Sequence, residues 1–204
     1  PHIKSIDAGV GNIIIDKAEV LYNVRTHNKE YHGTMYILLM TLIKTAIYFE
    51  TNQTDISFGS PMTTRNQEEI LDVVGLFLNT VIVRSLVPES GSLVDYYTIV
   101  KDSVSSVMAH ADYSFLEIAN LENESKNKGG GFNIGFNLNP NSSVENLNVE
   151  GFEFEPLKSK VNYVKTDLWF DVIDSDQAIV VNVSYRKDTF DSTFVNGLLY
   201  KIKS

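Results

Sequence analysis

The sequence contains no cysteine and little basic charge. Without cysteine it has no disulfide scaffold, no thiolate metal site and no cysteine nucleophile. Its 17 Lys and Arg residues against 26 Asp and Glu residues give a net charge of -9. An acidic protein repels phosphate, and we find no local basic patch. We therefore expect neither nucleic acid nor an anionic membrane as a partner.

Long hydrophobic runs are missing as well. The longest uncharged apolar stretch, residues 33–43, covers 11 of the 204 residues. A helix needs roughly 20 apolar residues to span a bilayer. Because no signal peptide stands out either, we expect a cytoplasmic protein. A content of 43% hydrophobic and 11% aromatic residues excludes general disorder and predicts a core that needs no metal or disulfide.

Three helices are predicted from apolar residues at helical spacing behind a capping side chain. The caps are Thr34, Ser92 and Asp191, and Ser92 forms a capping box with Asp95. The helix after Thr34 is apolar on most sides, so we expect it to be nearly buried. Two further helices are predicted, over residues 17–29 and after Ser114.

Strand patterns alternate with these helices. They cover residues 13–15, 55–59, 76–84, 132–138, 168–173 and 178–185. The last two flank a polar tip and predict a hairpin, whereas Gly59-Ser60-Pro61 should end the second strand. The fold class is therefore mixed α/β or α+β. Without internal repeats or a long linker, residues 1–204 form one domain, with residues 1–33 as a lead-in segment.

The histidines are the first candidates for a general base. His27 and His32 lie in a polar stretch, where solvated surface side chains explain them. His110 follows a predicted helix, where a cation is favourable. The serine-rich residues 103–106 lack the Gly-x-Ser-x-Gly turn that exposes a nucleophile. We therefore predict no catalytic residue within this chain.

Cofactor and metal motifs are incomplete. Gly9 and Gly11 lack the third glycine of a dinucleotide site, and glycines 129–131 lack the Lys-Ser/Thr of a phosphate loop. Asp171, Asp174 and Asp176 do not have the spacing of a calcium loop, and a hairpin tip explains them. We predict no bound metal and no directly bound cofactor.

Two places invite a functional interpretation. Residues 59–65 put glycine, proline and the charged Arg65 at the end of a predicted buried strand, where a loop can line a cleft. Asn79 lies within an apolar strand, and a buried amide must find partners for two donors and an acceptor. That amide is either a satisfied structural group or a group directed into a channel.

These two segments resemble a known family. Residues 59–65 and 74–84 are similar to the Gly-x-Pro-x-x-x-Arg and Gly-x-Phe-x-Asn-Thr-x-x-x-Arg signatures of nonribosomal peptide synthetase condensation domains. Residues 110–115 resemble the family's His-Gln-Asp-Tyr-Pro-Phe. Residues 166–168 and 185–191 are similar to its closing Asp-Leu strand and Tyr-x-x-x-Leu-Phe-Asp ending. The resemblance runs from about Thr34 to the C-terminus.

The resemblance implies a chloramphenicol-acetyltransferase-like half domain, a mixed sheet flanked by helices, which forms the C-terminal half of a two-part domain. The active site would lie in a tunnel between the halves. The substrate-tunnel residues would be Asn79, Ser60 and Pro61, and the residues that shape the cleft would be Gly59, Arg65, Gly75 and Arg84.

The sequence also departs from the family pattern. The catalytic His-His-x-x-x-Asp-Gly motif belongs to the N-terminal half and does not occur here. The chain alone should therefore be inactive. Residues 126–131 stand where the family has Arg-Asp-x-Ser-Arg-Asn-Pro-Leu, so the local geometry after residue 120 should differ.

By resemblance, the intact domain joins an acyl or peptidyl thioester on one carrier domain to the amine on a second. The implied partners are the N-terminal half of the domain and peptidyl carrier domains, which bring their phosphopantetheine arms. An exposed apolar face could also support a dimer. Two alternatives remain open: a non-catalytic carrier-binding or scaffold module of the same fold, and an acyltransferase that uses His32 or His110 as its base.

Overall fold

The computed structural model describes residues 7–16, 18, 33–65, 67–124, 131–140, 152, 164 and 166–204. The strands are β1 (Ala8–Asp16), β2 (Asp55–Thr63), β3 (Leu78–Leu86), β4 (Ile134–Pro140), β5 (Leu168–Asp174) and β6 (Ala178–Arg186). The helices are α2 (Met35–Thr51), α3 (Leu93–Met108), α4 (Phe115–Glu124) and α5 (Ser192–Lys203), with a short 3-10 turn η1 (Glu68–Ile70).

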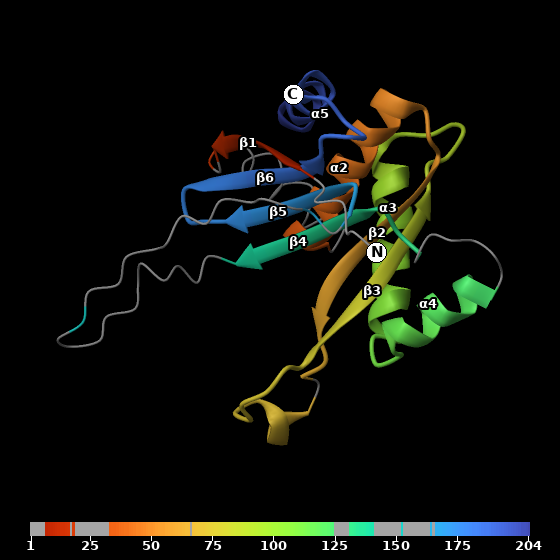
Figure 1. The fold of residues 1–204 in the computed structure, drawn as a ribbon, viewed down its shortest axis with the longest axis vertical. Helices are drawn as coiled ribbons and strands as arrows, with labels where there is room; N and C mark the ends of the chain where they lie inside the picture. Colours follow the sequence, from red (N-terminus) through yellow and green to blue (C-terminus); the bar gives the residue numbers. More distant parts are fainter. Residues whose placement is uncertain are drawn as a thin grey trace.

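The six strands form one mixed sheet in the order β1-β6-β5-β4-β2-β3 (Figure 1). Strand β4 runs parallel to both β2 and β5, and the other neighbours are antiparallel. Strands β5 and β6 form the predicted hairpin. The mixed sheet with its helices confirms the predicted fold class.

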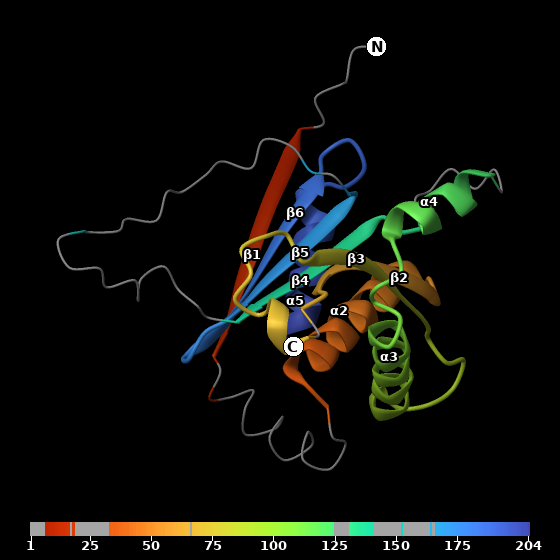
Figure 2. The ribbon, with the colours of Figure 1, turned by 90° about the horizontal axis from the view of Figure 1, so that it is seen from below.

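Helices α2, α3 and α5 cover one face of the sheet (Figures 1 and 2). Every second residue of a strand points to that face. The rings of Phe58, Phe136 and Phe170, from β2, β4 and β5, stack beneath α2 with centroids 6.2 and 6.3 Å apart. All three are fully buried. The opposite face of β1, β6 and β5 is not covered by any of the described helices.

The predicted caps begin the helices. The Thr34 hydroxyl accepts a hydrogen bond from the Ile37 amide, and Asp191 caps α5 in the same way. The capping box of Ser92 and Asp95 is complete. Helix α2 is largely buried, as its pattern predicts.

Strand β2 differs from the prediction because it continues through Ser60 and Pro61 to Thr63. Its parallel pairing with β4 covers only Phe58 and Gly59. Beyond Gly59 one side of β2 is an edge, and proline is tolerated at an edge because no neighbour needs its missing N–H. The predicted strand end at Gly59 was therefore wrong.

The N-terminal strand also differs. Strand β1 begins at Ala8 and not at residue 13, because it pairs with β6 over nine residues. The predicted helix over residues 17–29 lies outside the described residues apart from residue 18. No helix among the described residues is both long and apolar enough to cross a membrane.

Candidate functional site

The Asn79 side chain joins β3 to the connection between α3 and α4. Its Nδ2 donates hydrogen bonds to the carbonyl oxygens of Ala111, at 2.8 Å, and Tyr113, at 2.6 Å. Its Oδ1 accepts from the backbone amides of Thr80, at 3.0 Å, and Phe115, at 3.4 Å. Both donors and the acceptor are satisfied by backbone groups. This supports the structural interpretation of Asn79, and a contact with substrate stays a prediction.

The other two predicted tunnel residues lie on opposite faces of β2. Ser60 is fully buried on the helix side, where its Oγ accepts a hydrogen bond of 2.8 Å from the Tyr36 hydroxyl. Burial raises the pKa of Tyr36, and the hydrogen bond with Ser60 lowers it only in part. Pro61 points to the opposite face because side chains alternate along a strand. Their tunnel roles also stay predictions.

Arg65 braces the loop between β2 and β3. Its guanidinium donates hydrogen bonds to the carbonyl oxygens of Ile70, Leu71 and Gly75. Its Cζ also lies 4.2 Å from the centre of the Phe77 ring. A planar group with five donors can serve several carbonyls and stack on a ring at once. Arg65 and Gly75, both predicted as cleft residues, therefore meet in this loop.

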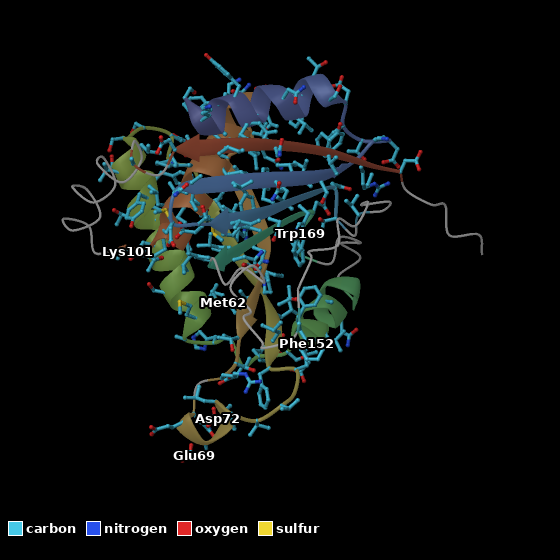
Figure 3. The ribbon with its side chains drawn as sticks, turned by 90° about the vertical axis from the view of Figure 1, so that its left-hand side faces the viewer. Met62, Glu69, Asp72, Lys101, Phe152 and Trp169 are labelled. Carbon is cyan, nitrogen blue, oxygen red and sulfur yellow. The ribbon has the colours of Figure 1, made fainter. Side chains whose placement is uncertain are left out.

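The braced loop exposes a row of aliphatic side chains. It extends away from the body of the chain, with Glu69 and Asp72 near its tip (Figures 1 and 3). We call this segment, together with the first residue of β3, the aliphatic loop; its exposed aliphatic side chains are Leu71, Val73, Val74, Leu76 and Leu78. Such grouped apolar side chains are typical of contact surfaces.

The last two predicted cleft residues lie elsewhere on β2 and β3. A side chain at Gly59 would place its Cβ 2.1 Å from the Phe132 ring, so only glycine lets this ring lie against the strand. Arg84 forms a two-point ion pair with Asp55, at 2.8 and 2.6 Å, on the exposed surface. Its hydrogen bonds lower the pKa of Asp55.

The histidines do not assemble a site among the described residues. His110 is exposed and lies just beyond the end of α3. His2, His27 and His32 lie outside the described residues. Within the described part of the chain, no three His, Asp or Glu side chains come together to hold a metal ion.

A groove that the sequence did not predict lies on the open face of the sheet, over β1, β6 and β5. It encloses about 650 Å³. Its lining residues are Val10, Gly11, Asn12, Trp169, Asp171, Asn182, Val183 and Ser184. His110 is not among them. No local pattern marked it, because the register between strands brings Asn12, Asp171 and Asn182 together.

Lys44 is the second feature that the sequence did not predict. Its side chain is fully buried in α2, and its Nζ donates to the carbonyl oxygens of Ile56 and Val83 and to the Ser85 hydroxyl, at 2.8 to 3.1 Å. The Nζ also lies 5.0 Å from the centre of the Phe58 ring. Burial lowers the pKa of Lys44 to about 7.

The fold is that of a chloramphenicol-acetyltransferase-like half domain. It is similar to the X-domain from teicoplanin biosynthesis, with a TM-score of 0.82 at 17% identity, over 99% of this chain and 47% of that chain. It is also similar to the condensation domain from the Monacolin K polyketide synthase MokA, with a TM-score of 0.78 at 15% identity, over 98% of this chain and 46% of that chain.

The condensation-domain family matches residues 5–204, so the chain belongs to this family. It is 26% identical to bacitracin synthase 3 of Bacillus licheniformis over 193 residues, which are 93% of this chain and 3% of that protein. It is 24% identical to enniatin synthetase of Fusarium oxysporum over 202 residues, 98% of this chain and 6% of that protein. The chain thus spans a few per cent of these relatives and just under half of the two solved domains.

Proposed function

We propose that this chain is the C-terminal half of an amide-forming condensation domain of a nonribosomal peptide synthetase. One observation carries the proposal: nearly the whole chain aligns with the two solved domains, yet it covers only 47% and 46% of them. The aliphatic loop between β2 and β3 supports it, because such a surface suits contact with a second half. We also propose that the protein is located in the cytoplasm.

The reaction joins two carrier-bound groups. The amine nitrogen of one group attacks the thioester carbonyl carbon of the other, the C–N bond forms, and the C–S bond breaks to release the carrier thiol. The amine loses a proton to a base. Because a thioester already has a good leaving group, most of the acceleration comes from positioning and proton handling. In this proposal the described sheet forms one wall of the tunnel between the two halves, and the N-terminal half supplies the base.

The proposal predicts that the chain alone forms no amide. The test supplies an aminoacyl thioester on one carrier and an amino acid on a second, and measures the joined product by mass spectrometry. The intact condensation domain of bacitracin synthase 3 that aligns with this chain, supplied with its own carriers, serves as the positive control. Product formed by this chain alone, above the rate without protein, would refute the proposal.

A second candidate is a non-catalytic docking module. It is favoured by the likeness to the X-domain solved in a complex with OxyB from teicoplanin biosynthesis, with a TM-score of 0.81 at 17% identity. This candidate predicts that the chain binds a phosphopantetheine-loaded carrier and that adding an N-terminal half produces no amide. Amide formation by the two halves together would exclude it.

A further inference from the structure

The Lys44 side chain is enclosed at the root of the β2–β3 arm, by which we mean the two strands and the loop between them (Figure 1). The root is the end of the arm away from that loop. There Nζ donates to the carbonyl oxygens of Ile56 on β2, at 3.1 Å, and Val83 on β3, at 2.8 Å. The third acceptor is the Ser85 hydroxyl, at 2.8 Å. An ammonium has three donors and no acceptor, so these three oxygens satisfy it completely.

The same three oxygens also fit a neutral amine, which has two N–H donors and one lone pair. The two carbonyl oxygens can only accept, so they keep the two N–H groups. The Ser85 hydroxyl can turn and donate to the lone pair, which a third carbonyl could not do. Because one of its three partners is a hydroxyl, this site can hold Lys44 with or without its proton.

The Ser85 hydroxyl passes the change on to helix α3. Its Oγ lies 3.1 Å from the Tyr96 hydroxyl, and either oxygen can be the donor. While Ser85 accepts from the ammonium, its own hydrogen can point to Tyr96. Once Ser85 donates to the neutral amine, Tyr96 becomes the donor to Ser85. Tyr96 is buried on α3, so a hydroxyl on one helix responds to the proton of a lysine on another.

The other charged and titratable groups around Lys44 keep one charge state near neutral pH. Burial lowers the pKa of Lys44 to about 7, and the Asp55 carboxylate on β2 raises it only in part. Hydrogen bonds with Arg84 of β3 lower the pKa of Asp55, which therefore stays ionised. Burial raises the pKa of Tyr96 and of Tyr97 on α3. Between about pH 6 and 9.5, Lys44 is the group of this cluster that changes charge.

We propose that Lys44, Ser85 and Tyr96 form a proton switch at the root of the β2–β3 arm. When the root opens, the ammonium releases its proton to water, and on closing the two hydroxyls point the opposite way. In the open root the pKa of Lys44 returns towards 10.5, so above about pH 7 the open form binds more protons than the closed form. Rising pH therefore holds the arm more firmly against α2 and α3. The switch lies within this chain, so it operates whichever of the proposed functions the chain has.

NMR tests the switch on the whole chain labelled with ¹³C at lysine Cε and tyrosine Cζ. One lysine signal, which contacts the Phe58 ring and is missing in Lys44→Met, should titrate near pH 7. The other lysine signals should titrate above about pH 9. The Tyr96 signal, identified by its loss in Tyr96→Phe, should titrate with the same midpoint as Lys44, because its hydroxyl changes from acceptor to donor.

Ser85→Ala separates the hydroxyl relay from the field of the charge. Without this hydroxyl the ammonium keeps only two acceptors, so the Lys44 midpoint should fall by about half a pH unit or more. The Tyr96 signal should lose most of its shift, although Lys44 still titrates. Ser103→Ala is the matched control, since it removes an α3 hydroxyl that donates to the Ile99 carbonyl. It should leave both midpoints within about 0.2 pH unit.

Hydrogen exchange measures how firmly the arm is held. After correction for intrinsic rates, exchange over residues 56–59 and 81–85 should slow by up to about tenfold per pH unit between about pH 7.5 and 9.5. In Lys44→Met it should not change with pH.

Three results would each overturn the switch. In the first, every lysine signal titrates above about pH 9. In the second, the Tyr96 signal shifts equally in Ser85→Ala and in the unchanged chain. In the third, exchange over the arm has the same pH dependence in Lys44→Met. The first two need no substitution at Lys44, so they decide the matter even if Lys44→Met does not fold.

Discussion

Asn79 and Tyr113 are 34 residues apart in sequence, yet the Asn79 amide nitrogen lies 2.6 Å from the Tyr113 carbonyl oxygen. The hydrogen bonds of Asn79 to Tyr113 and Ala111 connect two segments that resemble family signatures. One is residues 74–84, which include most of β3, and the other is residues 110–115, between α3 and α4. The two signatures therefore form one structural unit.

Replacing Asn79 by alanine should lower the free energy of unfolding by about 2–3 kcal/mol, because two carbonyls lose their donor and two backbone amides lose their acceptor. Urea unfolding measures the change, and hydrogen exchange over residues 111–117 should become faster. Thr80→Ala, one residue along the strand, is the control and should cost less. If Asn79→Ala unfolds within about 0.5 kcal/mol of the unchanged chain, the structural role is wrong.

Arg65→Lys should loosen the loop between β2 and β3 while changing global stability by less than about 1 kcal/mol. Lysine is a point charge that cannot serve three carbonyls and stack on Phe77 together. Hydrogen exchange over residues 67–77 should become faster. The control, Arg84→Lys, keeps the charge of an exposed ion pair and should leave this loop unchanged. Equal exchange in all three proteins would contradict the bracing role.

The buried Lys44 predicts a pH-dependent stability. With a folded-state pKa of about 7, against 10.5 for an ordinary lysine, the folded chain binds fewer protons than the unfolded chain between these values. Unfolding free energy should therefore rise with pH above about 7, by up to about 1.4 kcal/mol per pH unit. The measurement should stop near pH 9.5, because the buried tyrosines, whose pKa values are raised, oppose this trend at higher pH.

Lys44→Met is the comparison for that measurement, since methionine has a similar length and no charge. Its unfolding free energy should change little between pH 7 and about 9.5, so the two stability curves should converge as pH rises. Parallel curves would show that Lys44 keeps its proton in the folded chain.

The aliphatic loop should make the isolated chain bind a hydrophobic dye or associate into dimers. Replacing both Val74 and Leu76 by lysine should reduce dye fluorescence and dimer formation, with a stability change within about 0.5 kcal/mol, since both side chains are exposed. Tyr200→Lys removes an exposed ring on α5 and serves as the control. A monodisperse monomer that binds no dye would contradict an uncovered contact surface.

Local signals predicted much of this fold. Thr34, Ser92 and Asp191 mark helix starts because a cap depends on residues within one turn. The alternation in β5 and β6 predicts their hairpin for the same reason. These features depend on neighbours in sequence, and the structure confirms them.

The remaining features depend on distant neighbours. Strand β2 passes through Pro61 only because its pairing with β4 stops at Gly59. Lys44 can be buried because acceptors from β2 and β3 meet it. The hydrogen bond between Asn137 and Asp171 depends on the register of β4 with β5, which a long stretch of sequence separates. No local pattern contains that information.

The most direct test of the account joins this chain to the N-terminal half of the bacitracin synthase 3 condensation domain, and measures amide formed between carrier-bound substrates. We predict product from the joined protein, and none from the chain alone or from a joined protein with both histidines of the His-His-x-x-x-Asp-Gly motif changed to alanine. Product from the chain alone, or an undiminished rate without those histidines, would contradict the claim that this half supplies a wall and its partner supplies the base.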